Sequence, residues 1–263
     1  MSNTRPVERR GARLGSGVLA AALALAAAMT STVHAQETQP MNQTSSSVSD
    51  TLNARQQAIV PIAAFAAAGD MAKLNAALNQ GLDAGMTVSD AKEILVQVYA
   101  YAGFPRSLNA LGELMKVLEV RKQRGIQDAP GREPSRPIPK GDALLAAGTV
   151  NQTKLSGGPV AGPLFDFAPT ANEYLRTHLF GDIFERDNLD WQSRELATVG
   201  MLSALPGAES QLQSHMRISM HTGLTAGQLR QLTQVLAERV DAGAASRAGE
   251  ALERHLASLS ANE

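Results

Sequence analysis

Residues 189–223 read LDWQSRELATVGMLSALPGAESQLQSHMRISMHTG, and this stretch predicts two helices separated at Pro206-Gly207. Proline has no amide hydrogen to donate in a helix interior, and glycine tolerates a tight turn, so the pair marks a boundary. The second half carries residues spaced three and four apart, namely Leu212, His215, Met216 and Ser219. That spacing puts the four side chains on one face, so we expect two facing helices with a histidine between them.

Glu195 in the first helix and His215 in the second are the candidate catalytic residues. A carboxylate and an imidazole that face each other across an apolar cleft can share a proton, as general acid–base catalysis requires. Structural roles stay open for both, because His215 also suits a hydrogen-bonded helix interface and Glu195 also suits an ion pair with Arg194. Arg194 either binds a substrate carboxylate through its planar guanidinium or satisfies a helix end, and the second role is favoured.

Two further positions bear on the site. Tyr101 precedes a turn expected at Gly103 and either lines the pocket or fills the core; we take it as a candidate substrate-binding residue. His221 lies at a helix end, where a positive charge complements the helix dipole. It is six residues from His215, unlike the i, i+4 spacing of paired metal-binding histidines. The sequence therefore predicts no metal site and no cofactor.

The N-terminal residues 1–35 have the pattern of a secretory signal peptide. A basic start precedes the uncharged apolar run Val18–Met29, and Val33-His34-Ala35 supplies small residues at the cleavage positions. A membrane anchor is the alternative, but the apolar run is too short to span a bilayer comfortably. We expect cleavage after Ala35 and a periplasmic or secreted protein with no membrane segment after cleavage.

Composition excludes several classes of function. The chain has 24 basic and 25 acidic residues, and the signal peptide removes four arginines and one glutamate, which leaves a mildly acidic protein. No basic patch with interleaved aromatic residues is present, so nucleic acid is not an expected partner. The chain contains no cysteine, which excludes disulfides, catalytic thiols and thiolate metal sites.

The rest of the chain divides by composition. Residues 36–50 are rich in Ser, Thr, Gln and Asn and predict a disordered lead-in. Residues 51–122 and 163–260 have helical periodicity and almost no β-branched alternation, so we expect an all-α protein. Residues 123–162 are rich in Pro and Gly and predict a linker, with a short helical piece near Asp142–Ala147.

The two helical regions repeat each other. Three ordered landmarks recur at a period of roughly 138 residues. They are Leu52-Asn53 and Leu189-Asp190, Gly85-Met86-Thr87 and Gly223-Leu224-Thr225, and Ala102-Gly103 and Ala242-Gly243. Such a period predicts duplication of one helical unit, with the two copies packed against each other.

Several short segments carry a family resemblance. They are LFGDIFERDNLDWQSREL, a histidine eight residues before Gly223, GLT at 223–225, and GMTVSDAKEIL and YAYAGFP in the first copy. In these segments, roughly within residues 50–122 and 160–258, the chain resembles the carboxymuconolactone decarboxylase-like family, which shares a superfamily with the alkylhydroperoxidase D-like proteins. The resemblance implies two tandem all-α units that assemble into rings, and a homotrimer of two-repeat chains.

The chain departs from the peroxidase branch of that superfamily. That branch has Cys-x-x-Cys seven and four residues before the histidine, where this chain has Ala208 and Gln211. The glutamate and the histidine remain as Glu195 and His215, so the proton-relay residues are kept without the redox residues. Thiol peroxidase activity is disfavoured by the absence of cysteine.

The first copy lacks the pair, with Ala58 in place of the glutamate and Ala77 in place of the histidine. We therefore expect one site per chain, with a wall from the first copy or from a neighbouring subunit. The resemblance favours a cofactor-free lyase or isomerase that acts on a small carboxylated lactone or related acid. A non-catalytic oligomeric ligand-binding protein is the alternative, and export argues for a substrate other than the intracellular one that names the family.

Overall fold

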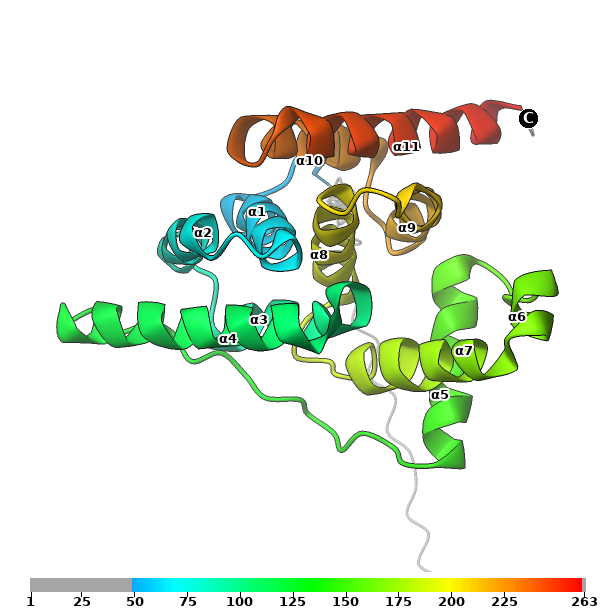
Figure 1. Cartoon of the computed structure of the whole chain (residues 1–263), viewed down its shortest axis with the longest axis horizontal. Coiled ribbons are helices and arrows are strands. Elements are labelled where there is room, and N and C mark those ends of the chain that lie inside the picture. The colour runs from blue at the N-terminus through cyan, green and yellow to red at the C-terminus, as the bar shows by residue number, and fades with distance from the viewer. Residues whose placement is uncertain (1–48, 262–263) are drawn as a thin grey trace, which may run out of the picture. The chain divides into compact units, whose positions relative to one another are not determined.

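The computed structural model describes residues 49–261, and within that range every regular element is a helix (Figure 1). The predicted signal peptide and nearly all of the lead-in lie outside the described residues. The first repeat contains α1 (Ala54–Ala68), α2 (Met71–Asp83), α3 (Val88–Gln97) and α4 (Tyr99–Gln123). The second contains α8 (Trp191–Ser203), α9 (Glu209–His221), α10 (Ala226–Arg239) and α11 (Ala242–Ser260). The all-α prediction is confirmed, and in residues 49–261 no helix has the length and apolarity to cross a membrane.

Matching caps begin matching helices in the two repeats. Thr87 accepts a hydrogen bond from the amide of Asp90 at the start of α3, and the Asp90 carboxylate accepts one in return. Thr225 and Gln228 form the same reciprocal capping box at the start of α10. Each box satisfies two amide hydrogens that a helix start leaves without partners. The helix boundary predicted at Pro206-Gly207 is also observed, since it falls between α8 and α9.

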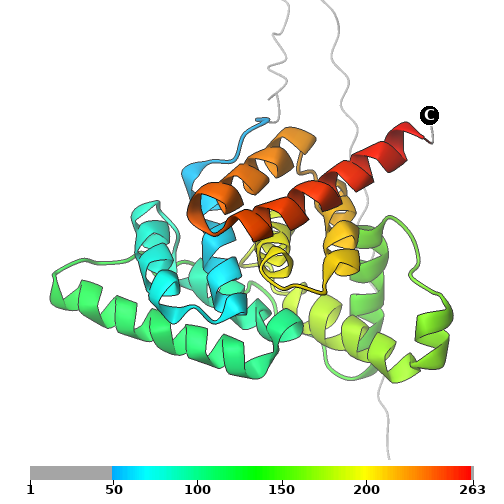
Figure 2. The ribbon, with the colours of Figure 1, turned by 45° about the horizontal axis from the view of Figure 1, so that its top comes forward.

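The core lies where the two repeats meet, at the crossing of α1 and α8 (Figures 1 and 2). An unbroken run of α1, residues 58–67, is buried on every face, which explains why its apolar residues show no single stripe. Gly200 permits the close approach of α8, because a Cβ there would lie 2.8 Å from the carbonyl oxygen of Val60. The repeats therefore share one core and do not pack as two separate domains.

Between the repeats the chain is more ordered than predicted. The helical piece expected near Asp142–Ala147 is in fact the first half of a longer helix, α5 (Asp142–Ser156), followed by α6 (Pro163–Phe167), α7 (Pro169–Tyr174) and the π-helix η1 (Leu175–Ile183). We call residues 142–183 the arm. Gly148 of α5 lies so close to η1 that a Cβ there would overlap the backbone carbonyl of Arg176. This tertiary contact, absent from the local sequence pattern, extends the helix.

Candidate functional site

Glu195 and His215 contact each other directly. The Nδ1 atom of His215 lies 2.8 Å from Oε2 of Glu195, and the glutamate side chain is 0% exposed while the imidazole is 9% exposed. The two helices bring them together as a hairpin, with Leu212, Met216 and Ser219 of the same α9 face buried. Because Nδ1 is occupied, the other ring nitrogen, Nε2, has no hydrogen-bond partner among residues 49–261. A carboxylate on Nδ1 fixes the tautomer that leaves Nε2 able to accept a proton.

Two buried polar atoms at this hairpin lack partners. They are Oε1 of Glu195 and the hydroxyl oxygen of Ser219, which lies one helical turn after His215. A buried polar atom without a partner costs on the order of 1–3 kcal/mol, so native structures rarely keep one without a functional reason or a bound molecule. Within the described residues, the hairpin therefore has unused hydrogen-bonding capacity next to the imidazole.

The first repeat supplies the aromatic neighbour of the imidazole. The ring of Tyr101 meets the His215 ring edge-on, with centroids 5.7 Å apart and an interplanar angle of 77°. Its hydroxyl oxygen accepts a hydrogen bond of 3.2 Å from Thr198, whose own oxygen accepts one of 2.7 Å from Gln97. Burial, followed by the charge of Glu195, raises the pKa of Tyr101 above its ordinary value of 10. The phenol therefore keeps its proton at neutral pH and stands ready as a donor.

The structure places Arg194 away from the candidate pair. Its side chain is 0% exposed, and Nη2 lies 2.9 Å from Oε2 of Glu93 in α3, so the expected ion pair with Glu195 is replaced by one with the first repeat. The same nitrogen donates to the backbone carbonyl of Arg186 at 2.8 Å, and burial lowers the pKa of Arg194. A guanidinium held in this way supports the structural role rather than substrate binding.

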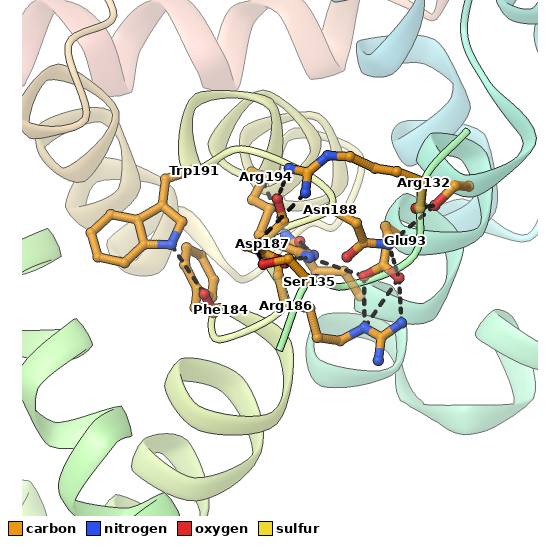
Figure 3. A network of polar contacts seen from close by, with 11 residues as sticks. Glu93, Arg132, Ser135, Phe184, Arg186, Asp187, Asn188, Trp191 and Arg194 are labelled. Carbon is orange, nitrogen blue, oxygen red and sulfur yellow. Dashed lines mark hydrogen bonds and ion pairs between the residues drawn. The ribbon is translucent and has the colours of Figure 1, made fainter. Parts of the chain in front are cut away.

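Glu93 is the centre of a polar network that sequence reasoning missed (Figure 3). Arg186 binds its carboxylate through Nε and Nη2, at distances of 2.7–3.1 Å, and Asn188 donates to it at 2.9 Å. Burial alone would raise the pKa of Glu93, but the hydrogen bonds from Arg186 and Asn188 and the charge of Arg194 hold it below its ordinary value. The available signal was the spacing of Glu93 and Gln97, which puts two polar residues on one face of an otherwise apolar helix.

Trp191 and His221 have structural placements. Trp191 donates from its indole nitrogen to the backbone carbonyl of Phe184 at 3.1 Å, which connects α8 to the segment after η1 (Figure 3). Nδ1 of His221 lies 3.0 Å from the carbonyl oxygen of Leu155, so the end of α9 is tied to α5 of the arm. Within residues 49–261 no group of three or more potential ligand side chains is arranged to hold a metal ion.

A comparison with known families decides the relationship of this chain. The model of the carboxymuconolactone decarboxylase family matches residues 39–115 and 169–254, which together are more than half of the chain. The chain belongs to this family. Carboxymuconolactone decarboxylase family membership confirms the two tandem helical units and supports a decarboxylase-like or alkylhydroperoxidase-like superfamily. No curated protein matches the chain.

The repeats of this family member differ at the candidate pair. Glu195 is the fifth residue of α8, and Ala58 is the fifth residue of α1; His215 is the seventh of α9, and Ala77 is the seventh of α2. The hairpin of the second repeat therefore carries the acid–base groups, and the corresponding hairpin of the first carries only alanines. This asymmetry leaves one Glu–His pair in each chain.

Proposed function

We propose that this protein is a cofactor-free lyase or isomerase that acts on a small carboxylated lactone or a related acid. The observation that carries the proposal is the 2.8 Å contact between Glu195 and His215, in which Nε2 of the imidazole is left without a protein partner. General acid–base chemistry at carbon needs one such group within reach of the substrate and a second that holds it in the right tautomer.

In the proposed reaction, Nε2 of His215 moves one proton. As a base it removes a proton from the carbon next to a carbonyl, and the C–H electrons form the enolate. The imidazolium is stabilised by the Glu195 carboxylate and returns the proton to another carbon, which shifts the double bond. When the substrate loses carbon dioxide, the electrons of the broken C–C bond form the enolate, and His215 as an acid protonates its carbon.

Tyr101 is the proposed substrate-binding residue. Its hydroxyl oxygen already accepts a hydrogen bond from Thr198, so its own hydrogen is available for a substrate oxygen. Donation to the oxygen on which negative charge develops would lower the barrier, because the donor is fixed before the reaction starts. The tyrosine belongs to the first repeat, so this repeat would supply a wall of the site even though it lacks the pair.

We extend the proposal to assembly and location. Large apolar side chains are exposed on α4, with Phe104 and Leu108 both 62% exposed, and on α6, with Leu164 at 69% and Phe167 at 87%. Exposed apolar patches of this kind mark interaction surfaces, which supports a homo-oligomer, and a homotrimer of two-repeat chains remains our expectation. The proposed location is the periplasm or the extracellular space.

The test uses a panel of carboxylated lactones and keto acids in deuterated buffer, followed by proton NMR. Deuterium entry at carbon, loss of a carboxylate or movement of a double bond would each support the proposal. His215→Asn should lower kcat by about 10²- to 10⁴-fold, and the loss caused by Glu195→Gln should fall in the same direction. His178→Asn is the matched control and should leave the rate unchanged, because that histidine side chain is 54% exposed on η1.

Two outcomes would reject it. If the wild type turns over no member of the panel while binding one, and His215→Ala binds equally well, the protein is a ligand-binding scaffold. If the wild type consumes an organic hydroperoxide at a rate that His215→Asn does not change, the acid–base assignment fails.

A further inference from the structure

A groove on the first repeat lies on the far side of Glu93 from Arg194. It has a volume of about 330 Å³, within the range of small-molecule sites, and runs between α3 and α4. Its apolar wall is formed by Val96, Leu114 and Leu118, and the exposed side chain of Met115 stands at its mouth. These four residues form a surface that suits the hydrocarbon part of a ligand.

One end of the groove is basic. Arg186 lines it and uses Nε and Nη2 to bind Glu93, but Nη1 has no partner among residues 49–261. In Figure 3 the third nitrogen of Arg186 points away from the Glu93 carboxylate. Lys92, which precedes Glu93 on α3, also lines the groove, and its ammonium has no ion-pair partner in the described part of the chain. Two nitrogen donors are therefore unused at the same end.

The local charge balance favours an anion. Glu93 is neutralised by Arg186 from the groove side and by Arg194 from the core side. Glu133 also lines the groove and contributes one negative charge, against the positive charge of Lys92. The five groups together carry one more positive than negative charge, and an added carboxylate would complete the balance. Arg186 is well suited to this role because its planar guanidinium can bind two carboxylates on different edges.

We propose that this groove binds a small monocarboxylate with an apolar body, such as an aryl-substituted or medium-chain acid. The carboxylate accepts hydrogen bonds from Nη1 of Arg186 and from the Lys92 ammonium, and the apolar body lies on Val96, Leu114 and Leu118. The site does not include His215 and does not depend on the acid–base function proposed above.

The experiment is isothermal titration calorimetry of the full chain with phenylacetate, compared with phenylacetamide, its neutral analogue of the same shape. Phenylacetate should bind at one site per chain and phenylacetamide about tenfold or more weakly, because the charged hydrogen bonds are lost. Lys92→Gln should weaken phenylacetate binding several-fold, and Met115→Gln should weaken both compounds. Lys122→Gln, on α4 but outside the groove lining, is the control and should change nothing.

The alternatives give different results. Equal affinity for the acid and the amide, or no saturable binding, would overturn the proposal. Binding abolished by His215→Asn and unaffected by Lys92→Gln would place the ligand at the hairpin instead. A mass measured by light scattering that falls to that of a single chain in Met115→Gln would show that a second copy occupies the groove. Phenylacetate binding that Lys92→Gln weakens and His215→Asn leaves unchanged supports the groove even if no turnover is found.

Discussion

Substitution of Glu93 by glutamine should destabilise the protein far more than any surface charge does. Arg194 is 0% exposed and Glu93 is 5% exposed, so the change leaves a guanidinium in the core without its counter-charge. Removing one partner of a buried ion pair costs on the order of 3–5 kcal/mol, because the remaining charge stays desolvated. Nε of Arg194 already lacks a partner, so the guanidinium has no spare hydrogen bond with which to compensate.

The matched control is Glu253→Gln. Glu253 pairs with Arg230 at 3.9 Å, and both side chains are more than half exposed, so its loss should cost between zero and about 1 kcal/mol. The assay is urea unfolding at pH 7, followed by far-ultraviolet circular dichroism and by the fluorescence of Trp191, the only tryptophan. In a Glu93→Gln/Arg194→Leu double variant, much of the lost free energy should return, because no unpaired charge remains.

The pH dependence provides a second readout. The folded pKa of Glu93 lies below its ordinary value of 4.5, so its stabilising effect is fully present above that value and is lost as the pH falls through the folded pKa. The stability difference between the wild type and Glu93→Gln should therefore shrink on acidification. If Glu93→Gln and Glu253→Gln cost the same at pH 7, the claim that the first repeat holds α8 through this pair is wrong.

Three further substitutions test separate contacts. Gly200→Ala should cost about 1–3 kcal/mol in thermal unfolding, since its Cβ meets the backbone of α1, whereas Gly249→Ala has open space and should cost nothing. Gly148→Ala should separate α5 from η1 and speed proteolysis within the arm, and Gly158→Ala, also in open space, should not. Tyr101→Phe should remove an ionisation seen at 295 nm well above pH 10. The raised pKa also means that the wild type loses stability as the pH rises above 10, and the phenylalanine variant should lose less; an unchanged titration would refute this placement.

The features that local chemistry determines were predictable from the sequence. The capping boxes depend on residues three apart, so Thr87 and Asp90 could be paired by inspection. The approach of His215 to Glu195 followed from helix periodicity and one turn, together with the family resemblance. No local pattern could reveal that Arg194 pairs with Glu93, because the two residues are about a hundred positions apart and meet only when the repeats pack. The same limit explains the misjudged length of α5, whose residues gain their partners from η1.

The burial of α1 and α8 on every face has a consequence for the origin of the chain. A single repeat expressed alone would expose one of these helices to water along its whole length, so a one-repeat ancestor had to pair with a copy of itself. Fusion of the two genes made that pairing permanent and independent of concentration. One copy was then free to lose its reactive side chains, as Ala58 and Ala77 record, and to specialise as the surface against which the other copy works.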